Sequence, residues 1–340
     1  MDADINFNKA VDILQKNINE SIKEMNTLKK DIELIEKEVS TIKNNLIIED
    51  EIDVEEYIMK TLIIPDIHCR EFFIEPLMDV LKNKPNVKIV CLGDYLDGYP
   101  SEWYERYSGY TTIDYQRLGI ENLQLLIDLK KKYNDRITLL MGNHDATYMI
   151  SLQLCNCRAD LYNYNEICDI FKNNSELFDI CHEEIINNKK FIYSHAGIDK
   201  RWEREIIEEF NLTKSTDKDE PIECDKLNKL FHDSLKIEKY SDNKFAIKLR
   251  EKSYLRGGYS SYGSIIWTDI RDFADNYIDN KPINDSLYND VIQIVGHTQT
   301  IDKAISIRGK IYDLDVRQCF YIDNVGNIRY YNTNDNIDKK

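Results

Sequence analysis

Residues 88–97 have the sequence Lys-Ile-Val-Cys-Leu-Gly-Asp-Tyr-Leu-Asp. The first half is a short apolar run rich in β-branched residues, which predicts a buried strand. The run ends at Gly93 and Asp94, so a carboxylate lies at the carboxyl end of the strand. Ligands bind at this edge in open α/β sheets. Gly-Asp is also an ordinary turn, so the pattern is informative only if it recurs along the chain.

The pattern of an apolar run followed by polar, ligand-type residues recurs four more times. These runs end in Asp66-Ile67-His68, in Gly142-Asn143-His144-Asp145, in Ser194-His195 and in Gly296-His297. Four of the six histidines therefore stand at expected strand ends. Oxygen and imidazole groups at several strand ends can converge on one rim of a sheet, and this donor set suits Mn, Fe or Zn. The sequence thus predicts a metal site.

The five motifs, in this order, resemble the calcineurin-like metallophosphoesterase superfamily over residues 61–298. The resemblance implies an α/β fold, a sandwich of two mixed sheets flanked by helices. It also implies two divalent metal ions, with Mn as the first expectation and Fe or Zn as alternatives. The implied ligands, with Asp94 bridging both ions, are Asp66, His68, Asp94, Asn143, His195 and His297.

Within this resemblance His144 is the general acid that protonates the leaving oxygen, and Asp97 fixes its tautomer. Asp145 is the alternative partner of His144, or it holds the turn. The sequence is most similar to the Ser/Thr protein phosphatase branch, because no second His follows Gly-His and because residues 267–269 are Trp-Thr-Asp, similar to Trp-Ser-Asp of that branch.

Two arginines of that branch are absent here, since their positions hold Gly98 and Met141. A planar guanidinium can bind two phosphate oxygens, so other arginines are candidates for the missing contact. Arg256 is the first candidate, and Arg158 and Arg70 are weaker ones. A surface salt bridge is the alternative role for each.

The expected function is hydrolysis of a phosphate monoester, on a phosphorylated protein or small molecule, by in-line attack of water activated between two ions. A phosphodiesterase or a dinucleoside polyphosphate hydrolase is the alternative within the superfamily. A non-catalytic coiled-coil scaffold with a vestigial site is an alternative of another class. The complete set of ligand residues disfavours the scaffold.

Composition narrows the class of partner. The 340-residue chain carries a net charge of −16, which disfavours nucleic acid because such binding depends on Lys and Arg. An acidic N-terminus without an apolar segment predicts no signal peptide, and no apolar run approaches the length of a membrane span. We therefore expect a cytoplasmic protein whose eight cysteines, which lack CxxC spacing, are reduced thiols.

The N-terminal residues 1–48 have an apolar heptad pattern. The eleven a and d positions run from Val11 to Leu46, and only Ser21 among them is polar. This pattern predicts a coiled coil that makes the protein a homo-oligomer, with a long helix packed within the chain as the alternative.

The remaining boundaries follow from composition. Residues 49–60 are an acidic linker, 61–331 the catalytic domain, and 332–340 a frayed tail. Residues 211–256 are polar and are expected to form an irregular insertion or cap. Helices are expected over 113–133 and 200–210, a loop over 99–112, a strand and turn over 263–269, and short strands near 304–307, 318–322 and 328–331.

Overall fold

The computed structural model describes residues 58–99, 112–154, 158–214, 220–274, 276–278, 281–283, 286–300 and 303–332. The predicted coiled coil over 1–48 lies outside the described residues, as do most of the acidic linker, residues 100–111 of the predicted loop and residues 333–340 of the tail.

The first sheet has six strands in the order β13-β12-β1-β2-β3-β4. Strands β1 to β4 run parallel, whereas β12 is antiparallel to β1 and β13 to β12. Because the first four are parallel, their carboxyl ends share one edge. The bounds are β1 Met59–Ile64, β2 Lys88–Cys91, β3 Ile137–Leu140, β4 Phe178–Asp179, β12 Phe320–Asp323 and β13 Ile328–Tyr330.

The second sheet has five strands in the order β10-β11-β9-β6-β5. Strands β6, β9 and β11 are parallel, and β5 and β10 pair antiparallel at the two edges. The bounds are β5 Cys181–Ile186, β6 Lys189–Ser194, β9 Val291–Val295, β10 Ile305–Ile307 and β11 Ile311–Asp313. A separate hairpin joins β7 Asn276–Ile278 to β8 Lys281–Ile283.

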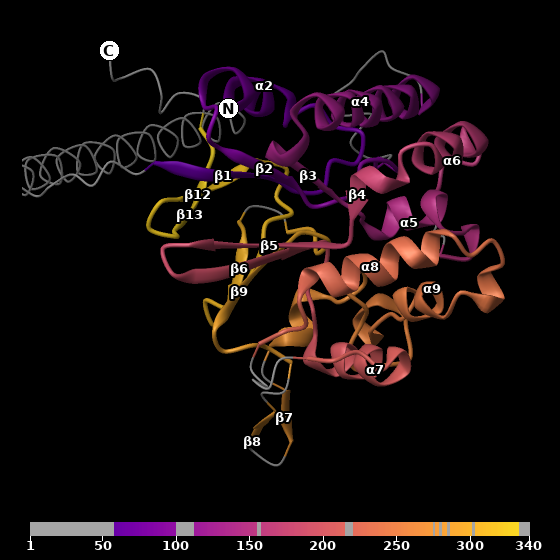
Figure 1. Cartoon of the computed structure of the whole chain (residues 1–340), viewed down its shortest axis with the longest axis vertical. Helices are drawn as coiled ribbons and strands as arrows, with labels where there is room; N and C mark the ends of the chain where they lie inside the picture. The colour runs from indigo at the N-terminus through magenta and orange to yellow at the C-terminus, as the bar shows by residue number, and fades with distance from the viewer. Residues whose placement is uncertain are drawn as a thin grey trace, which may run out of the picture. The chain divides into compact units, whose positions relative to one another are not determined.

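The two sheets pack face to face, and helices cover their outer faces (Figure 1). Apolar side chains from both sheets, among them Val90, Leu140 and Ile294, form a fully buried layer between them. A second cluster joins the first sheet to α2, α4 and α6, and a third joins the second sheet to α7, α8 and α9. The predicted α/β sandwich of two mixed sheets is therefore confirmed.

The helices have the following bounds. The α-helices are α2 Ile74–Asn83, α4 Thr112–Tyr133, α5 Asn143–Met149, α6 Tyr164–Lys172, α7 Lys200–Phe210, α8 Cys224–Leu235 and α9 Lys244–Leu249. The 3₁₀ turns are η1 Asn134–Arg136, η2 Leu152–Leu154, η3 Ser175–Leu177, η4 Tyr240–Asp242, η5 Tyr254–Arg256 and η6 Ile270–Phe273. The helices predicted over 113–133 and 200–210 are confirmed.

The prediction that residues 211–256 are irregular is wrong. Helices α8 and α9 lie in this range, and Leu227, Phe231 and Leu249 are completely buried in the same cluster as the second sheet. These apolar residues recur at helical spacing but are outnumbered by charged neighbours, which hid the pattern.

Two smaller predictions also need correction. Residues 263–269 form a turn rather than a strand, because the amides of Trp267 and Thr268 both donate to the Ser264 carbonyl, at 2.9 and 3.0 Å. Strand β1 begins at Met59, so the expected linker ends before residue 60.

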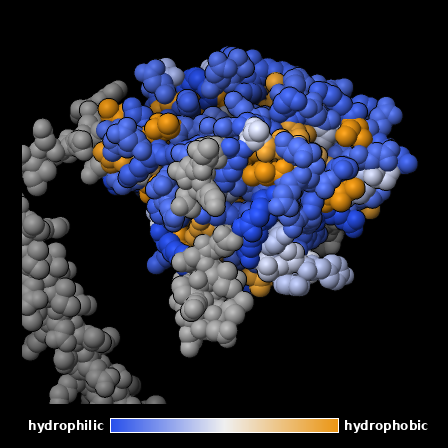
Figure 2. All heavy atoms as spheres, turned by 60° about the horizontal axis from the view of Figure 1, so that its bottom comes forward, coloured by the Kyte–Doolittle hydropathy of each residue, from blue (hydrophilic) through white to orange (hydrophobic). Residues whose placement is uncertain are grey.

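The face of the molecule shown in Figure 2 is mostly hydrophilic, with small separate hydrophobic areas. Within the described part of the chain, no helix has the length and apolar character needed to cross a membrane.

Candidate metal centre

The predicted ligands come from loops that follow strands of both sheets. Asp66 and His68 follow β1, Asp94 follows β2, and Asn143 begins α5 just after β3. His195 and His297 follow β6 and β9 of the second sheet. None of the six is more than 7% exposed. Parallel strands end at one edge of each sheet, and this is why residues far apart in the sequence meet.

Asp94 is the central residue of the cluster. Its Oδ2 lies 3.5 Å from Nε2 of His68 and 3.5 Å from Nε2 of His195. Two groups of metal-ligating side chains, whose ligand atoms lie within 4.8 Å of one another, both contain it. One group adds His68 and His144, and the other adds His195 and His297. Asp94 thus occupies the position predicted for a bridging carboxylate.

The other predicted ligands adjoin these groups. Asn143 Oδ1 lies 2.9 Å from His195 Nε2, and His297 Nδ1 lies 3.1 Å from the same atom. Both Asp66 oxygens accept the His297 amide at 3.0 Å, and Asp66 Oδ2 is 4.0 Å from His68 Nε2. All six predicted ligands therefore lie together. Nε2 of His297 is buried and has no hydrogen-bond partner among the described residues.

Backbone carbonyls set the tautomers of two imidazoles. Nδ1 of His68 lies 2.9 Å from the Leu96 carbonyl, and Nδ1 of His195 lies 2.9 Å from the Leu92 carbonyl. A carbonyl only accepts, so Nδ1 carries the proton in both rings. Each Nε2 then presents a lone pair to Asp94, and such a lone pair is what a metal ion requires.

Burial shifts the pKa values of this cluster in the direction that favours a cation. It lowers the pKa of His195 to about 3 and holds the pKa of His68 and His297 well below the usual value. Burial, together with neighbouring carboxylates, raises the pKa of Asp66 and Asp94. Buried carboxylates beside neutral imidazoles are stabilised by a bound cation, so the residues fit divalent metal ions.

The backbone approaches the carboxylates closely. A Cβ atom at Gly142 would lie 2.2 Å from Asp94 Oδ1, and one at Gly296 would lie 2.0 Å from Asp66 Oδ1. Asp94 and His297 adopt left-handed backbone conformations, with φ of 53° and 72°. Non-glycine residues in this region are strained and are concentrated at functional sites.

His144 pairs with Asp97. Its Nδ1 lies 2.7 Å from Asp97 Oδ2, and the second Asp97 oxygen accepts from the Tyr148 hydroxyl and from the Asp160 amide at 3.3 Å. The Asp145 carboxylate instead accepts three backbone amides of the surrounding loops, including Gly142 at 2.8 Å. Asp145 therefore holds the turn, and Asp97 is the partner of His144.

The three candidate arginines all border the site, in different ways. Arg158 Nη2 lies 2.9 Å from His144 Nε2. Arg256 donates to Thr298 Oγ1 at 2.9 Å and to the His297 carbonyl at 3.3 Å, and its Nε is 2.9 Å from Asp269. Arg70 Nη1 lies 3.4 Å from the Asp66 carbonyl. Arg158 thus contacts the predicted general acid directly.

Gly98 stands where the protein phosphatase branch has arginine, and packing explains the difference. A Cβ atom at Gly98 would lie 2.1 Å from Cε1 of Tyr115, whose hydroxyl donates to the His68 carbonyl at 3.1 Å. The next residue, Tyr99, places its ring centroid 3.6 Å from the Arg158 guanidinium carbon. The Arg158 guanidinium is thus held over an aromatic ring beside His144.

Three residues beside the site were missed from the sequence. Tyr148 lies four residues after His144 on α5, a spacing that puts both on one helix face and could have revealed it. Tyr99 and Lys252 had no such signal. Lys252 Nζ lies 3.7 Å from the Trp267 ring centroid, and that ring lies 5.6 Å from the His297 ring.

Together, the fold and the site define a hydrolase-type metal centre with the hydrogen-bonded His144–Asp97 pair beside it. The chain belongs to the calcineurin-like phosphoesterase family, whose model matches residues 59–299. It is 37% identical over 84 residues to the "Putative serine/threonine-protein phosphatase" of Caenorhabditis elegans, a segment that is 25% of this chain and 18% of that relative.

Solved structures show a distant likeness. A cold-active protein-tyrosine phosphatase of a psychrophilic Shewanella species matches with a TM-score of 0.45 and 16% identity, over 81% of each chain. A Saccharomyces cerevisiae protein serine/threonine phosphatase matches with a TM-score of 0.41 and 13% identity, over 79% of this chain and 74% of that one.

Proposed function

We propose that the protein hydrolyses phosphate monoesters with two divalent metal ions, in the manner of a protein phosphatase. The observation that carries the proposal is the buried His144–Asp97 pair, 2.7 Å apart, next to a cluster in which Asp94 belongs to both ligand groups. Bound ions would supply Lewis acidity to the phosphoryl group and to water.

Different residues of the chain would hold the two ions and transfer the proton. Asp66, His68 and Asp94 would hold one ion, and Asp94, Asn143, His195 and His297 the other. In the reaction the oxygen of water bonds to phosphorus and the bond from phosphorus to the leaving oxygen breaks. Nε2 of His144 gives its proton to that leaving oxygen, and Asp97 keeps the other ring nitrogen protonated and the ring in place.

Arg158 links phosphate binding to this proton transfer. Its guanidinium donates to Nε2 of His144 at 2.9 Å, and a phosphate oxygen is a stronger, charge-assisted acceptor. If the guanidinium moves to the phosphate, Nε2 would take up from solvent the proton that it then gives to the leaving oxygen, and the attacking water would release one proton to solvent in exchange. Burial lowers the pKa of His144, and the Asp97 carboxylate opposes this shift. Arg158 would therefore bind the substrate phosphate and, by the same movement, free Nε2 of His144.

The test compares p-nitrophenyl phosphate with bis-p-nitrophenyl phosphate, with Mn²⁺ added and with chelator, for the wild type and for His144→Asn. We expect metal-dependent hydrolysis of the monoester that falls by roughly tenfold in the variant, less than the loss usual for general acid catalysis because p-nitrophenolate needs little protonation. Asp94→Asn should abolish turnover and reduce bound metal. Preference for the diester would replace the proposal with a phosphodiesterase, and no turnover of either ester with metal bound would contradict it.

A further inference from the structure

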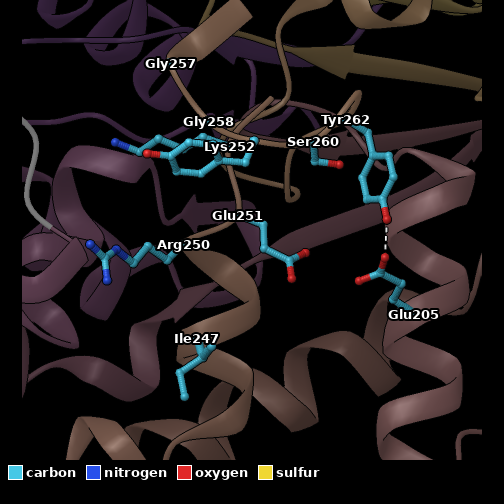
Figure 3. Close-up of a pocket in the computed structure, with 10 residues that line it drawn as sticks. Glu205, Ile247, Arg250, Glu251, Lys252, Gly257, Gly258, Ser260 and Tyr262 are labelled. Atoms are coloured by element: carbon cyan, nitrogen blue, oxygen red, sulfur yellow. Dashed lines mark hydrogen bonds between the residues drawn. The ribbon is translucent and has the colours of Figure 1, made fainter. Parts of the chain in front are cut away.

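The loop of residues 250–262 borders both the metal centre and a groove with a volume of about 620 Å³. Arg250, Lys252, Tyr259 and Tyr262 of this loop line the groove. Glu205 of α7 also lines it and accepts a hydrogen bond from the Tyr262 hydroxyl (Figure 3). The same loop supplies Arg256, which donates to the His297 carbonyl at 3.3 Å. The loop of residues 250–262 therefore lines the groove and also contacts the metal centre.

Lys252 connects the groove to the site most directly. Its side chain lines the groove, and its Nζ lies over the Trp267 ring, which is nearly perpendicular to the His297 ring with centroids 5.6 Å apart. If the phosphate of a substrate lies at the metal centre, the neighbouring part of the substrate would therefore enter this groove.

Backbone hydrogen bonds hold the loop in one conformation. The Tyr254 amide donates to the Ser260 carbonyl at 2.7 Å, and the Gly258 amide donates to the Ser253 carbonyl at 2.8 Å. A Cβ atom at Gly258 would lie 1.8 Å from the Lys252 carbonyl oxygen, so the chain crosses itself there without room for a side chain. A preformed wall of this kind costs little ordering entropy when a ligand binds.

The groove has a small excess of positive charge when Lys248 is counted, with three cations against the carboxylates of Glu205 and Glu251. Lys248 pairs with Glu205 at 2.6 Å and with Glu251 at 2.9 Å, so both carboxylates already have a cation. In Figure 3 Glu205 and Glu251 face each other, and Arg250 and Lys252 extend away from them. Among the described residues, Arg250 makes no ion pair or side-chain hydrogen bond. A guanidinium in this state is suited to a carboxylate.

The shape and the overall charge point to a peptide. Tyr259 lines the groove and is 96% exposed, so its ring is accessible for packing against a peptide. The groove's volume exceeds what a phosphate group alone needs and lies in the range of ligand pockets. The net charge of −16 disfavours nucleic acid, whereas a groove with one positive charge in excess would favour acidic segments over basic ones.

We infer that this groove is a substrate subsite that takes acidic residues next to the phosphorylated residue of a peptide. The inference rests on the proposed monoester hydrolysis. Arg250 and Lys252 would bind the flanking Asp or Glu side chains, and Tyr259 would pack against the peptide.

The test uses the full chain loaded with Mn²⁺ and two phosphopeptides that differ only in acidic or basic flanking residues. We expect kcat/KM to favour the acidic peptide by roughly three- to tenfold, the effect of a few exposed charge contacts, and the preference to shrink at high salt. Arg250→Glu should abolish or reverse the preference and leave p-nitrophenyl phosphate turnover unchanged. Lys239→Glu, the same charge change at an exposed position on another segment, should keep the preference.

The outcomes separate this inference from the proposed function. Equal turnover of the two peptides, or a preference that survives Arg250→Glu, would overturn the subsite while leaving a phosphatase. Hydrolysis of a nucleoside monophosphate with higher kcat/KM than either peptide would also overturn the peptide as occupant. Absence of all monoester turnover would remove the proposed function itself. Labelled acidic peptide should also bind Asp94→Asn protein more tightly than the basic one, a readout independent of turnover.

Discussion

Asp97→Asn should separate proton donation from phosphate binding. The Asp97 carboxylate accepts from His144 Nδ1 at 2.7 Å with one oxygen, and from the Tyr148 hydroxyl and the Asp160 amide with the other. An asparagine has only one acceptor oxygen, so its NH₂ group must face a donor in either orientation. The imidazole then loses both its negative partner and its fixed tautomer. We expect kcat to fall by roughly 100-fold when the leaving group is poor.

The assay compares phenyl phosphate with 2,4-dinitrophenyl phosphate under saturating Mn²⁺. The dinitrophenolate leaves without protonation, so its hydrolysis should fall by less than about tenfold, whereas phenyl phosphate shows the full loss. Tyr148→Phe is the matched control, because it removes one hydrogen-bond donor to Asp97 and keeps the carboxylate. It should lower kcat by less than about tenfold on either substrate. Equal losses on the two substrates, with bound metal and thermal unfolding unchanged, would show that Asp97 does not act through a proton donor.

Three other predictions concern the rest of the chain. Phe231→Ala, in the completely buried face of α8, should reduce the free energy of unfolding by about 3–5 kcal/mol in urea titrations; a loss below 1 kcal/mol would mean that residues 220–256 are a dispensable cap. Burial alone would raise the pKa of Asp323, but hydrogen bonds from Arg329 and from nearby amides outweigh burial, and the pKa is lowered. Asp323→Asn should therefore reduce the free energy of unfolding by about 1–3 kcal/mol at pH 7. The difference should vanish as the pH falls through the lowered pKa of the folded state, and a pH-independent difference would contradict this. We also propose that residues 1–48 self-associate, so deletion of residues 1–50 should lower the mass measured by light scattering and leave turnover intact; an unchanged mass would exclude it.

The sequence predicted the metal centre well because strand ends determine its geometry. Each ligand follows an apolar run, and parallel pairing of β1, β2 and β3 brings the ends of these runs together whatever lies between them. The pairing of His144 with Asp97 also followed from the motif. No spacing rule ranked the three arginines, because the contact between Arg158 and His144 depends on tertiary packing against Tyr99.

Helix α8, the turn at residues 263–269 and strand β5 were not predicted from sequence patterns, for physical reasons. The apolar residues of α8 are diluted by charged residues, so a segment that contributes to the core resembled a loop. Residues 263–269 form an apolar run that is buried as a turn, and periodicity alone cannot distinguish this from a strand. Strand β5 was not predicted, because His182, Glu183 and Glu184 interrupt its apolar pattern.

The imidazoles of the site differ in what their orientation depends on. His68 and His195 are oriented by carbonyls of residues 96 and 92, and a main-chain carbonyl remains whichever side chain occupies those positions. His144 depends on one particular carboxylate, which a single nucleotide change can remove. Substitution at positions 92 or 96 would therefore leave these two imidazoles oriented, whereas substitution of Asp97 would leave His144 without its partner. A variant that lacks Asp97 keeps all six ligand residues, so metal content alone would not reveal its loss of proton donation.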